Sequence, residues 1–197
     1  MSVLLNHWFI ADLHLGHRNI ITPGWDDRPF DTIEDHDETL TANCAAEGTS
    51  GRTLWILGDV AFRQGHLKAF LERVMPHWHR VVLIRGNHDD RVAWRLRDLF
   101  SSAHEAFYER ARDKEAGIDV RFYMSHYAHR VWRNSNHGSY HIHGHSHGHL
   151  RHWGRSIDVG ANCVGYKPIS LEEVVRLRCS EAPVNHHIKE TKEPRFL

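Results

Sequence analysis

The sequence predicts an α/β protein whose first half forms a mainly parallel β-sheet. Short apolar runs at residues 8–11, 54–57 and 81–84 each end at a turn-forming residue, as buried strands do. Polar segments with helical spacing, at residues 32–46 and 65–75, lie between these runs. Strands that alternate with helices indicate a parallel sheet, and such sheets bind ligands beyond the carboxyl ends of their strands.

The limits of the helices follow from residues that start or stop a helix. Asp31 is expected to cap the first helix, and Pro76 to stop the second, because proline cannot continue the hydrogen-bond pattern. A third helix is expected over residues 91–100, opened by Asp89 or Asp90.

The second half of the chain is expected to be largely sheet. Ser170 and Glu173 have capping-box spacing and open a helix that ends near Arg178. One domain is therefore predicted over residues 1–179, followed by a polar tail at residues 180–197. The expected hairpin arms and further strands lie at residues 106–111, 118–124, 140–143 and 156–160.

Composition excludes several classes of protein. Lys plus Arg and Asp plus Glu both number 25, so the chain lacks the positive charge typical of a duplex-binding protein. Its three cysteines are far apart, which favours buried thiols over a disulfide framework or a thiolate zinc site. Residues 1–10 lack the basic flank of a signal peptide, and no run approaches the roughly 20 apolar residues of a membrane span. A cytoplasmic protein is expected.

Five short blocks follow predicted strands and carry side chains that bind metals. The chain holds 20 histidines, yet chance would not place them at successive strand ends next to glycines. His145 and His147, one residue apart and flanked by glycines, can supply one imidazole to each of two metal ions. The blocks are Asp12-Leu13-His14-Leu15-Gly16, Gly58-Asp59, Gly86-Asn87-His88-Asp89, Ser125-His126-Tyr127 and His143-Gly144-His145-Ser146-His147-Gly148.

The order D-x-H-x-G, G-D, G-N-H-D, H, G-H-x-H resembles the calcineurin-like metallophosphoesterase superfamily, in particular its small single-domain members of bacterial and phage type. The resemblance covers residues 5–178, since residues 158–160 and 168–173 also look like the closing strand and helix of that superfamily. It implies a four-layer α/β/β/α sandwich of two mixed sheets, with two metal ions at the joint edge of the sheets.

The resemblance also implies a ligand set in which Asp59 bridges the two metals. Nitrogen and oxygen ligands suit Mn first, with Fe, Zn, Ni and Co as alternatives. One metal would be held by Asp12, His14, Asp59 and His147, and the other by Asp59, Asn87, His126 and His145.

A pair of metals held by these ligands would support the hydrolysis of a phosphoester. Two metals about 3.5–4 Å apart, if held by these ligands, would make water acidic enough to attack a phosphoester, and their surplus positive charge would attract the phosphate. His88, next to a ligand but outside the set, is expected to be the general acid. Asp89 either orients His88 or caps the following helix. His17, Arg28 and Arg130 are candidates for binding substrate, with solvated loop residues as the alternative.

Other aromatic and histidine side chains have weaker signals. Trp25 and Trp132, in predicted loops, could stack on a base. Most of the remaining histidines of this region are expected at the surface, and some to orient ligand imidazoles: His141, His143, His149 and His152.

The predicted function is hydrolysis of a phosphomonoester or small phosphodiester, with nucleotides and cyclic nucleotides among the candidates. The expected partner is thus a small phosphorylated substrate rather than long duplex nucleic acid or a membrane. Two alternatives remain open, a catalytically silent scaffold that binds proteins and a nuclease acting on nucleic-acid ends. A metal buffer is disfavoured, because buffering needs neither Asn87 nor glycines at strand ends.

Overall fold

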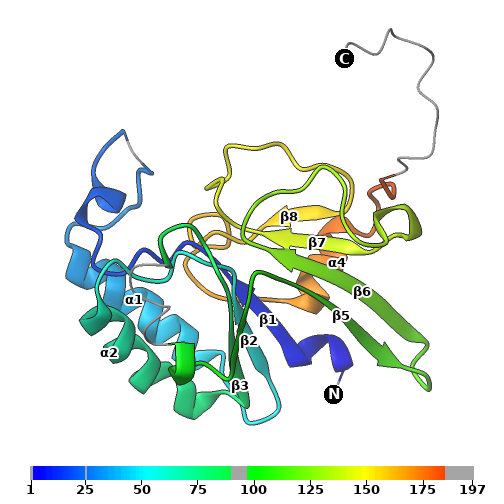
Figure 1. Cartoon of the computed structure of the whole chain (residues 1–197), viewed down its shortest axis with the longest axis horizontal. Coiled ribbons are helices and arrows are strands. Elements are labelled where there is room, and N and C mark those ends of the chain that lie inside the picture. The colour runs from blue at the N-terminus through cyan, green and yellow to red at the C-terminus, as the bar shows by residue number, and fades with distance from the viewer. Residues whose placement is uncertain (1, 25, 90–96, 185–197) are drawn as a thin grey trace, which may run out of the picture.

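The computed structural model describes residues 2–24, 26–89 and 97–184. Its two mixed β-sheets pack face to face, with α1 and α2 on the outer side of the first (Figure 1). The helices are α1 (Ile33–Ala46), α2 (Gln64–Val74) and α4 (Leu171–Arg178), and the 3-10 turns are η1 (Val3–Asn6), η2 (Arg18–Ile21), η3 (Met75–His77), η5 (Arg97–Leu99) and η6 (Ser135–His137). The strands are β1 (His7–Ile10), β2 (Thr53–Ile56), β3 (Arg80–Ile84), β4 (Ser102–His104), β5 (Ala106–Asp113), β6 (Ile118–Ser125), β7 (Tyr140–His143), β8 (Ser156–Asp158) and β9 (Ile169–Ser170).

The first sheet has the order β4-β3-β2-β1-β9. Neighbours from β1 to β4 run parallel, whereas β9 pairs with β1 antiparallel. Ile10 lies opposite Ile56, and Ile56 opposite Leu83, so β1, β2 and β3 end at one edge. The prediction of an α/β fold with parallel strands at these three runs is confirmed. The short β4 was not predicted, because Ser102-Ala103-His104 contains no apolar run.

The helices α1 and α2 cover one face of the first sheet. Ile10 and Ile56 point to this side and pack in one buried cluster with Leu40 of α1 and Leu67 of α2. The predicted cap of α1 was wrong by one residue, because the Oγ1 atom of Thr32 accepts the hydrogen bond of the first turn.

The end of α2 lies near the predicted stop, whereas most of the third predicted helix cannot be compared with the structure. The α2 helix ends at Val74, and Pro76 lies in the 3-10 turn that follows. The predicted helix at residues 91–100 falls largely outside the described residues, and Arg97–Leu99 forms a 3-10 turn.

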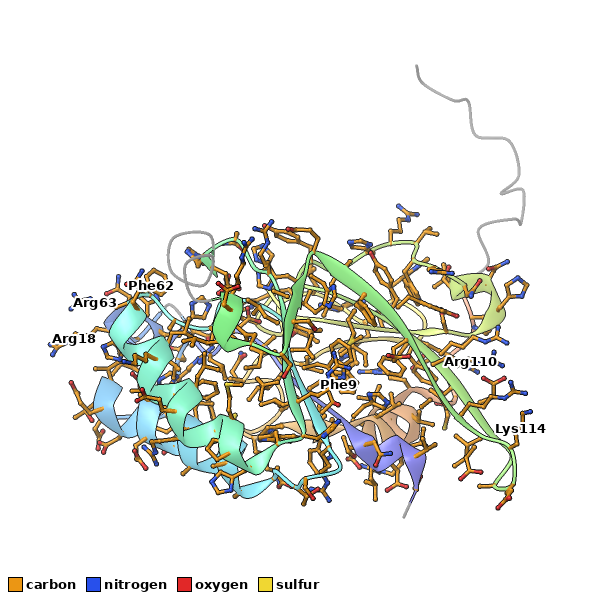
Figure 2. The ribbon with its side chains drawn as sticks, turned by 60° about the horizontal axis from the view of Figure 1, so that its bottom comes forward. Phe9, Arg18, Phe62, Arg63, Arg110 and Lys114 are labelled. Carbon is orange, nitrogen blue, oxygen red and sulfur yellow. The ribbon has the colours of Figure 1, made fainter. Side chains whose placement is uncertain are left out.

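The second sheet has the order β5-β6-β7-β8 and packs against the other face of the first. Its β5–β6 hairpin is antiparallel, while β6, β7 and β8 run parallel. Phe9 and Phe122 meet between the sheets with ring centroids 5.6 Å apart, and Figure 2 shows Phe9 in the middle of the molecule. The N–H of Ala11 donates to the carbonyl of Val159, which joins the two sheets near the ends of β1 and β8.

A loop, residues 126–139, covers the outer face of the second sheet. Trp132 of this loop is buried against His141 with ring centroids 5.1 Å apart, and its indole N–H donates to Ser139. Trp132 therefore cannot stack on a base, and His141 and His143 are buried rather than at the surface. Trp25 lies outside the described residues.

The four-layer arrangement is not confirmed. It needs a helical layer on the outer face of the second sheet, and α4 is the one α-helix among the described residues that lies near this sheet. Leu171 and Val174 of α4 join the buried cluster between the sheets. The predicted cap of α4 is confirmed, since the Ser170 hydroxyl accepts the N–H of Glu173. Among the described residues, no helix is both long and apolar enough to cross a bilayer.

Candidate metal centre

The predicted metal ligands meet where strands of both sheets end. Six of the seven, all but Asn87, form two sets in which the donor atoms lie within 4.8 Å of one another. We call Asp12, His14 and His147 the first group, and Asp59, His126 and His145 the second group. The predicted ligands follow β1, β2, β3, β6 and β7 in that order: Asp12 and His14, Asp59, Asn87, His126, and His145 with His147.

Five of these ligands have a left-handed backbone conformation, which is strained for a residue with a Cβ atom. A left-handed residue turns the chain sharply at the strand end, so side chains two residues apart can face the same point. Such strain is typical of functional sites, because the surrounding structure must hold it in place. The φ angles are 55° at Asp12, 49° at His14, 53° at Asp59, 68° at His145 and 48° at His147.

Three glycines of the motifs lie where a Cβ atom would clash with a predicted ligand. A Cβ atom on Gly86 would lie 2.3 Å from Oδ1 of Asp59, and one on Gly144 would lie 2.6 Å from Oδ2 of Asp12. Gly58 has a φ of +90°, and a Cβ there would lie 2.4 Å from Nδ1 of His126. The glycines of the sequence motifs therefore leave space for the ligand side chains themselves.

The first group contains buried polar atoms without hydrogen-bond partners in the part of the chain that the structure describes. Oδ2 of Asp12 accepts the N–H of His145, but Oδ1 of Asp12 and both ring nitrogens of His14 have none. Burial raises the pKa of Asp12 to about 7, against the lowering effect of His126 and His147, and burial lowers the pKa of His14. Unpartnered buried groups are costly, and a cation would satisfy Oδ1 of Asp12 together with one ring nitrogen of His14. The residues present therefore fit a metal ion.

Asp59 lies between the two groups. Its Oδ2 atom is 3.8 Å from Nε2 of His14 and 3.5 Å from Nε2 of His126. Burial would raise the pKa of Asp59, but the hydrogen bond and charge of His126 lower it to about 2. The pKa of His126 is raised to about 9, because Asp59 and Asp12 outweigh burial, which would lower it. Asn87 joins the second group, with its Oδ1 atom 3.0 Å from Nε2 of His126.

Two ligand imidazoles are oriented by hydrogen bonds at Nδ1. His126 donates to the carbonyl of Leu57 at 2.8 Å, and His147 lies 2.9 Å from a carboxylate oxygen of Asp26. An imidazole whose Nδ1–H is donated keeps the lone pair of Nε2 for a metal. Sequence reasoning missed Asp26, because nothing in the local sequence separates it from other loop carboxylates.

His88 lies beside the centre but belongs to neither group. Its side chain is 46% exposed, and its Nε2 atom is 3.9 Å from Oδ2 of Asp59. The backbone N–H of His88 donates to Oδ1 of Asp59 at 2.9 Å.

Asp89 supports the backbone of the centre. Its carboxylate accepts the N–H groups of Asp59, Val60 and Gly86 at 2.8–3.0 Å. Its hydrogen bonds within the described residues do not include the imidazole of His88, so the predicted orienting contact is not found. The alternative cap would involve residues that the structure does not describe.

The predicted substrate residues occupy three different environments. The side chain of Arg28 is 0% exposed, so a substrate in solvent cannot reach it, contrary to the expectation. His17 stacks on Phe62 with ring centroids 3.9 Å apart and lies beside His14. Arg130 is exposed and lies over Trp153 instead of a metal ligand.

Comparisons with known proteins place the chain among relatives of similar size. No family model matches the sequence. It is 28% identical over 177 residues to an uncharacterized protein of Methanocaldococcus jannaschii, across 86% of this chain and 89% of that protein. The crystal structure of a protein of unknown function from Aquifex aeolicus shares the fold, with a TM-score of 0.64 and 24% identity over 87% of this chain and 98% of that one.

A phage protein resembles the chain over a still longer stretch. The gene 66 protein of Mycobacterium phage L5 is 30% identical in an alignment 207 positions long, which covers 92% of this chain and 95% of that protein. On this likeness along almost the whole of both chains, the protein belongs to the family of the mycobacteriophage L5 gene 66 protein.

Proposed function

We propose that this protein is a cytoplasmic dinuclear metallophosphohydrolase that cleaves a phosphomonoester or a small phosphodiester, with nucleotides among the candidate substrates. The observation that carries the proposal is the position of Oδ2 of Asp59 between imidazoles of both donor groups. A carboxylate in that position suits a bridging ligand between two cations. The motif order supports placing the protein in the calcineurin-like metallophosphoesterase superfamily, with its four-layer sandwich and with Mn as the first candidate metal.

Charge at the centre favours a phosphate. Two divalent cations would supply positive charge that binds the phosphate and acidifies water for attack on phosphorus. Asp12 and Asp59 together offset only about half of that charge, so a local surplus draws a phosphate dianion. The chain as a whole has zero formal net charge, which does not favour long duplex nucleic acid.

The leaving group needs a proton, and His88 can supply it. When water attacks phosphorus, the bond from phosphorus to the leaving oxygen breaks, and Nε2–H of His88 transfers its proton to that oxygen. The hydrogen bond from the His88 backbone to Asp59 fixes the histidine beside the centre. Asn87, His88 and His145 are all exposed, so a substrate can reach this side from solvent.

Metal content and activity test the proposal together. Protein purified without a histidine tag, depleted of metal and reloaded with Mn²⁺ is assayed on phosphomonoesters, cyclic nucleotides and diesters. We expect about two metals per chain, one for each group, and hydrolysis that a chelator abolishes. Asp59→Asn should weaken both metals together and reduce activity by more than the roughly 10–100-fold typical of losing an outer partner of a ligand.

Asp119→Asn is the matched control, because Asp119 pairs with Arg110 on the exposed hairpin. This variant should keep both metals and full activity. If Asp59→Asn binds two metals with wild-type affinity, Asp59 does not bridge. If the metal-loaded wild type hydrolyses none of the esters, the proposed function is wrong and a non-catalytic scaffold is the better description.

A further inference from the structure

We propose that Asp26, held in place by Arg28, is a positioning residue that selectively sets the metal affinity of the first group by orienting His147. The inference rests on the metal centre of the proposed function, but not on the identity of the reaction. It concerns one of the two metal positions, and the experiment below measures binding instead of catalysis.

Asp26 and Asn162 hold His147 at both its ring and its backbone. Oδ2 of Asp26 lies 2.9 Å from Nδ1 of His147, and Oδ1 of Asp26 accepts a hydrogen bond from Nδ2 of Asn162 at 3.2 Å. The same Asn162 amide donates to the carbonyl of His147 at 2.9 Å. The side chain of Asp26 is 4% exposed, so water competes little for these contacts. The imidazole of His147 is therefore fixed with Nε2 free for a metal.

Arg28 fixes Asp26 and the loop of the other two ligands of the first group. Its Nε–H donates to Oδ2 of Asp26 at 2.7 Å, and its Nη2–H donates to the carbonyl of Asp12 at 2.8 Å. A weaker contact joins Nη1 to the carbonyl of Leu13 at 3.4 Å. One buried guanidinium thus ties the carboxylate behind His147 to the turn that carries Asp12 and His14. Its positive charge also compensates the buried carboxylate.

Arg28 is in turn anchored to α1. Its Nη1 lies 2.9 Å from Nε2 of His36, and because arginine has only donors, this histidine nitrogen is the acceptor. Nδ1 of His36 then donates to Oδ1 of Asp37, whose Oδ2 accepts the N–H of Gly16. The network ends on the D-x-H-x-G turn where the first group begins. It is therefore a closed frame around that group.

Within the described residues, no carboxylate is hydrogen-bonded to Nδ1 of a histidine of the second group. Nδ1 of His126 donates to a neutral carbonyl, that of Leu57. The ring of His145 is exposed and contacts His126 and Tyr127, with no side-chain hydrogen bond among the described residues. A carboxylate hydrogen-bonded to Nδ1 raises the basicity of a ligand imidazole and fixes its orientation, and among the described residues only His147 has one at this position.

Binding of Zn²⁺ and Co²⁺ to metal-free protein tests the inference. Calorimetry should resolve two binding steps in the wild type. In Asp26→Asn, which keeps the size of the side chain and one acceptor oxygen, one step should weaken by about 10–100-fold while the other stays unchanged. The same variant is labelled with ¹⁵N-histidine and loaded with Zn²⁺ for NMR. Compared with the wild type, the Nδ1–H of His147 should lose its protection from exchange, whereas that of His126 should keep it.

Two further variants keep the test decisive. Asn162→Ala removes one support of Asp26 and should weaken the same step by a smaller factor, which serves if Asp26→Asn does not fold. Glu38→Gln, at an exposed ion pair with Arg73, is the control and should change neither step. Equal weakening of both steps, or no weakening, in a variant that folds and binds two metals would overturn the inference. A wild type that binds metal but cleaves no ester would contradict only the proposed function.

Discussion

His88 combines a fixed backbone with a side chain open to solvent. Its N–H is held by Asp59, while its ring lies against Phe62 with centroids 4.9 Å apart. The exposed imidazole can exchange protons with solvent and still stay beside the centre. Figure 2 shows Phe62 with Arg63 and Arg18 at one end of the molecule, away from the hairpin residues Arg110 and Lys114.

At the residue scale, we expect His88→Ala to separate catalysis from metal binding. The variant should keep both metals, because His88 belongs to neither donor group. Its rate on alkyl phosphates, which leave poorly, should fall by about 10²–10⁴-fold, whereas p-nitrophenyl phosphate needs little protonation and should be affected much less. Steady-state kinetics on both esters are the measurement, with the exposed His77→Ala as control. Equal losses on the two esters would make His88 a phosphate-binding residue instead of the general acid.

The turns after β2 and β3 are the elements on which the centre depends. Asp89, from the second turn, accepts backbone N–H groups of both turns, so the two hold each other in place. Gly58 and Gly86 pack so closely that a Cβ on Gly58 would lie 2.7 Å from the Cα atom of Gly86. The two turns therefore support each other.

At the element scale, Gly58→Ala should lower the free energy of unfolding by about 1–3 kcal/mol or more, because alanine is strained at φ +90° and its Cβ would clash. Metal affinity should fall as well, since the clash involves His126. Urea unfolding of metal-free protein is the measurement. Gly65→Ala, in α2 with no atom within 4 Å of the new Cβ, should be neutral or stabilise by about 0.4–1 kcal/mol. Equal stability of the two variants would contradict the role given to Gly58.

Strands made of buried apolar runs could be predicted from the sequence. A strand that forms only because it pairs with a neighbouring strand could not, and neither could contacts made by loops. The strands β1, β2 and β3 match their predicted runs, whereas β4 forms by pairing along β3, which no local pattern encodes. The side chains of the candidate metal centre could be picked out from the sequence because they follow strand ends in short motifs with glycine. Asp26 was missed, because its partner His147 is 121 residues away in the chain.

The burial of polar side chains could not be predicted from the sequence either. His141 alternates with apolar neighbours on β7, as a surface residue would, yet the loop at residues 126–139 covers it. Its Nε2 atom lies 3.0 Å from the hydroxyl of Ser125. The pKa of His141 is well below its ordinary value, chiefly because of burial, with smaller effects of His143 and His129.

At the scale of the whole molecule, this burial should make stability depend on pH. The folded state keeps His141 neutral, whereas in the unfolded state it takes up a proton near pH 6.5. The contribution of His141 to stability should therefore be complete above about pH 6.5 and fall as the pH decreases, by about 1.4 kcal/mol per pH unit, until the folded pKa of His141 is reached.

Urea unfolding in the presence of a chelator, between about pH 5 and 7, measures this dependence without competition from metals. His141→Gln should make the slope shallower by about one proton, whereas the exposed His77→Gln should leave it unchanged. An unchanged slope in His141→Gln would mean that another group carries the acid sensitivity.

Each donor group draws on both sheets, and this has a consequence for the integrity of the chain. Asp12 and His14 come from the first sheet and His147 from the second, while Asp59 comes from the first and His126 and His145 from the second. If the chain were cut between β4 and β5, neither fragment would hold a complete set for even one ion. A bound metal would then hold the two fragments together through ligands from each. Metal that stays bound would therefore show that the fragments had reassembled.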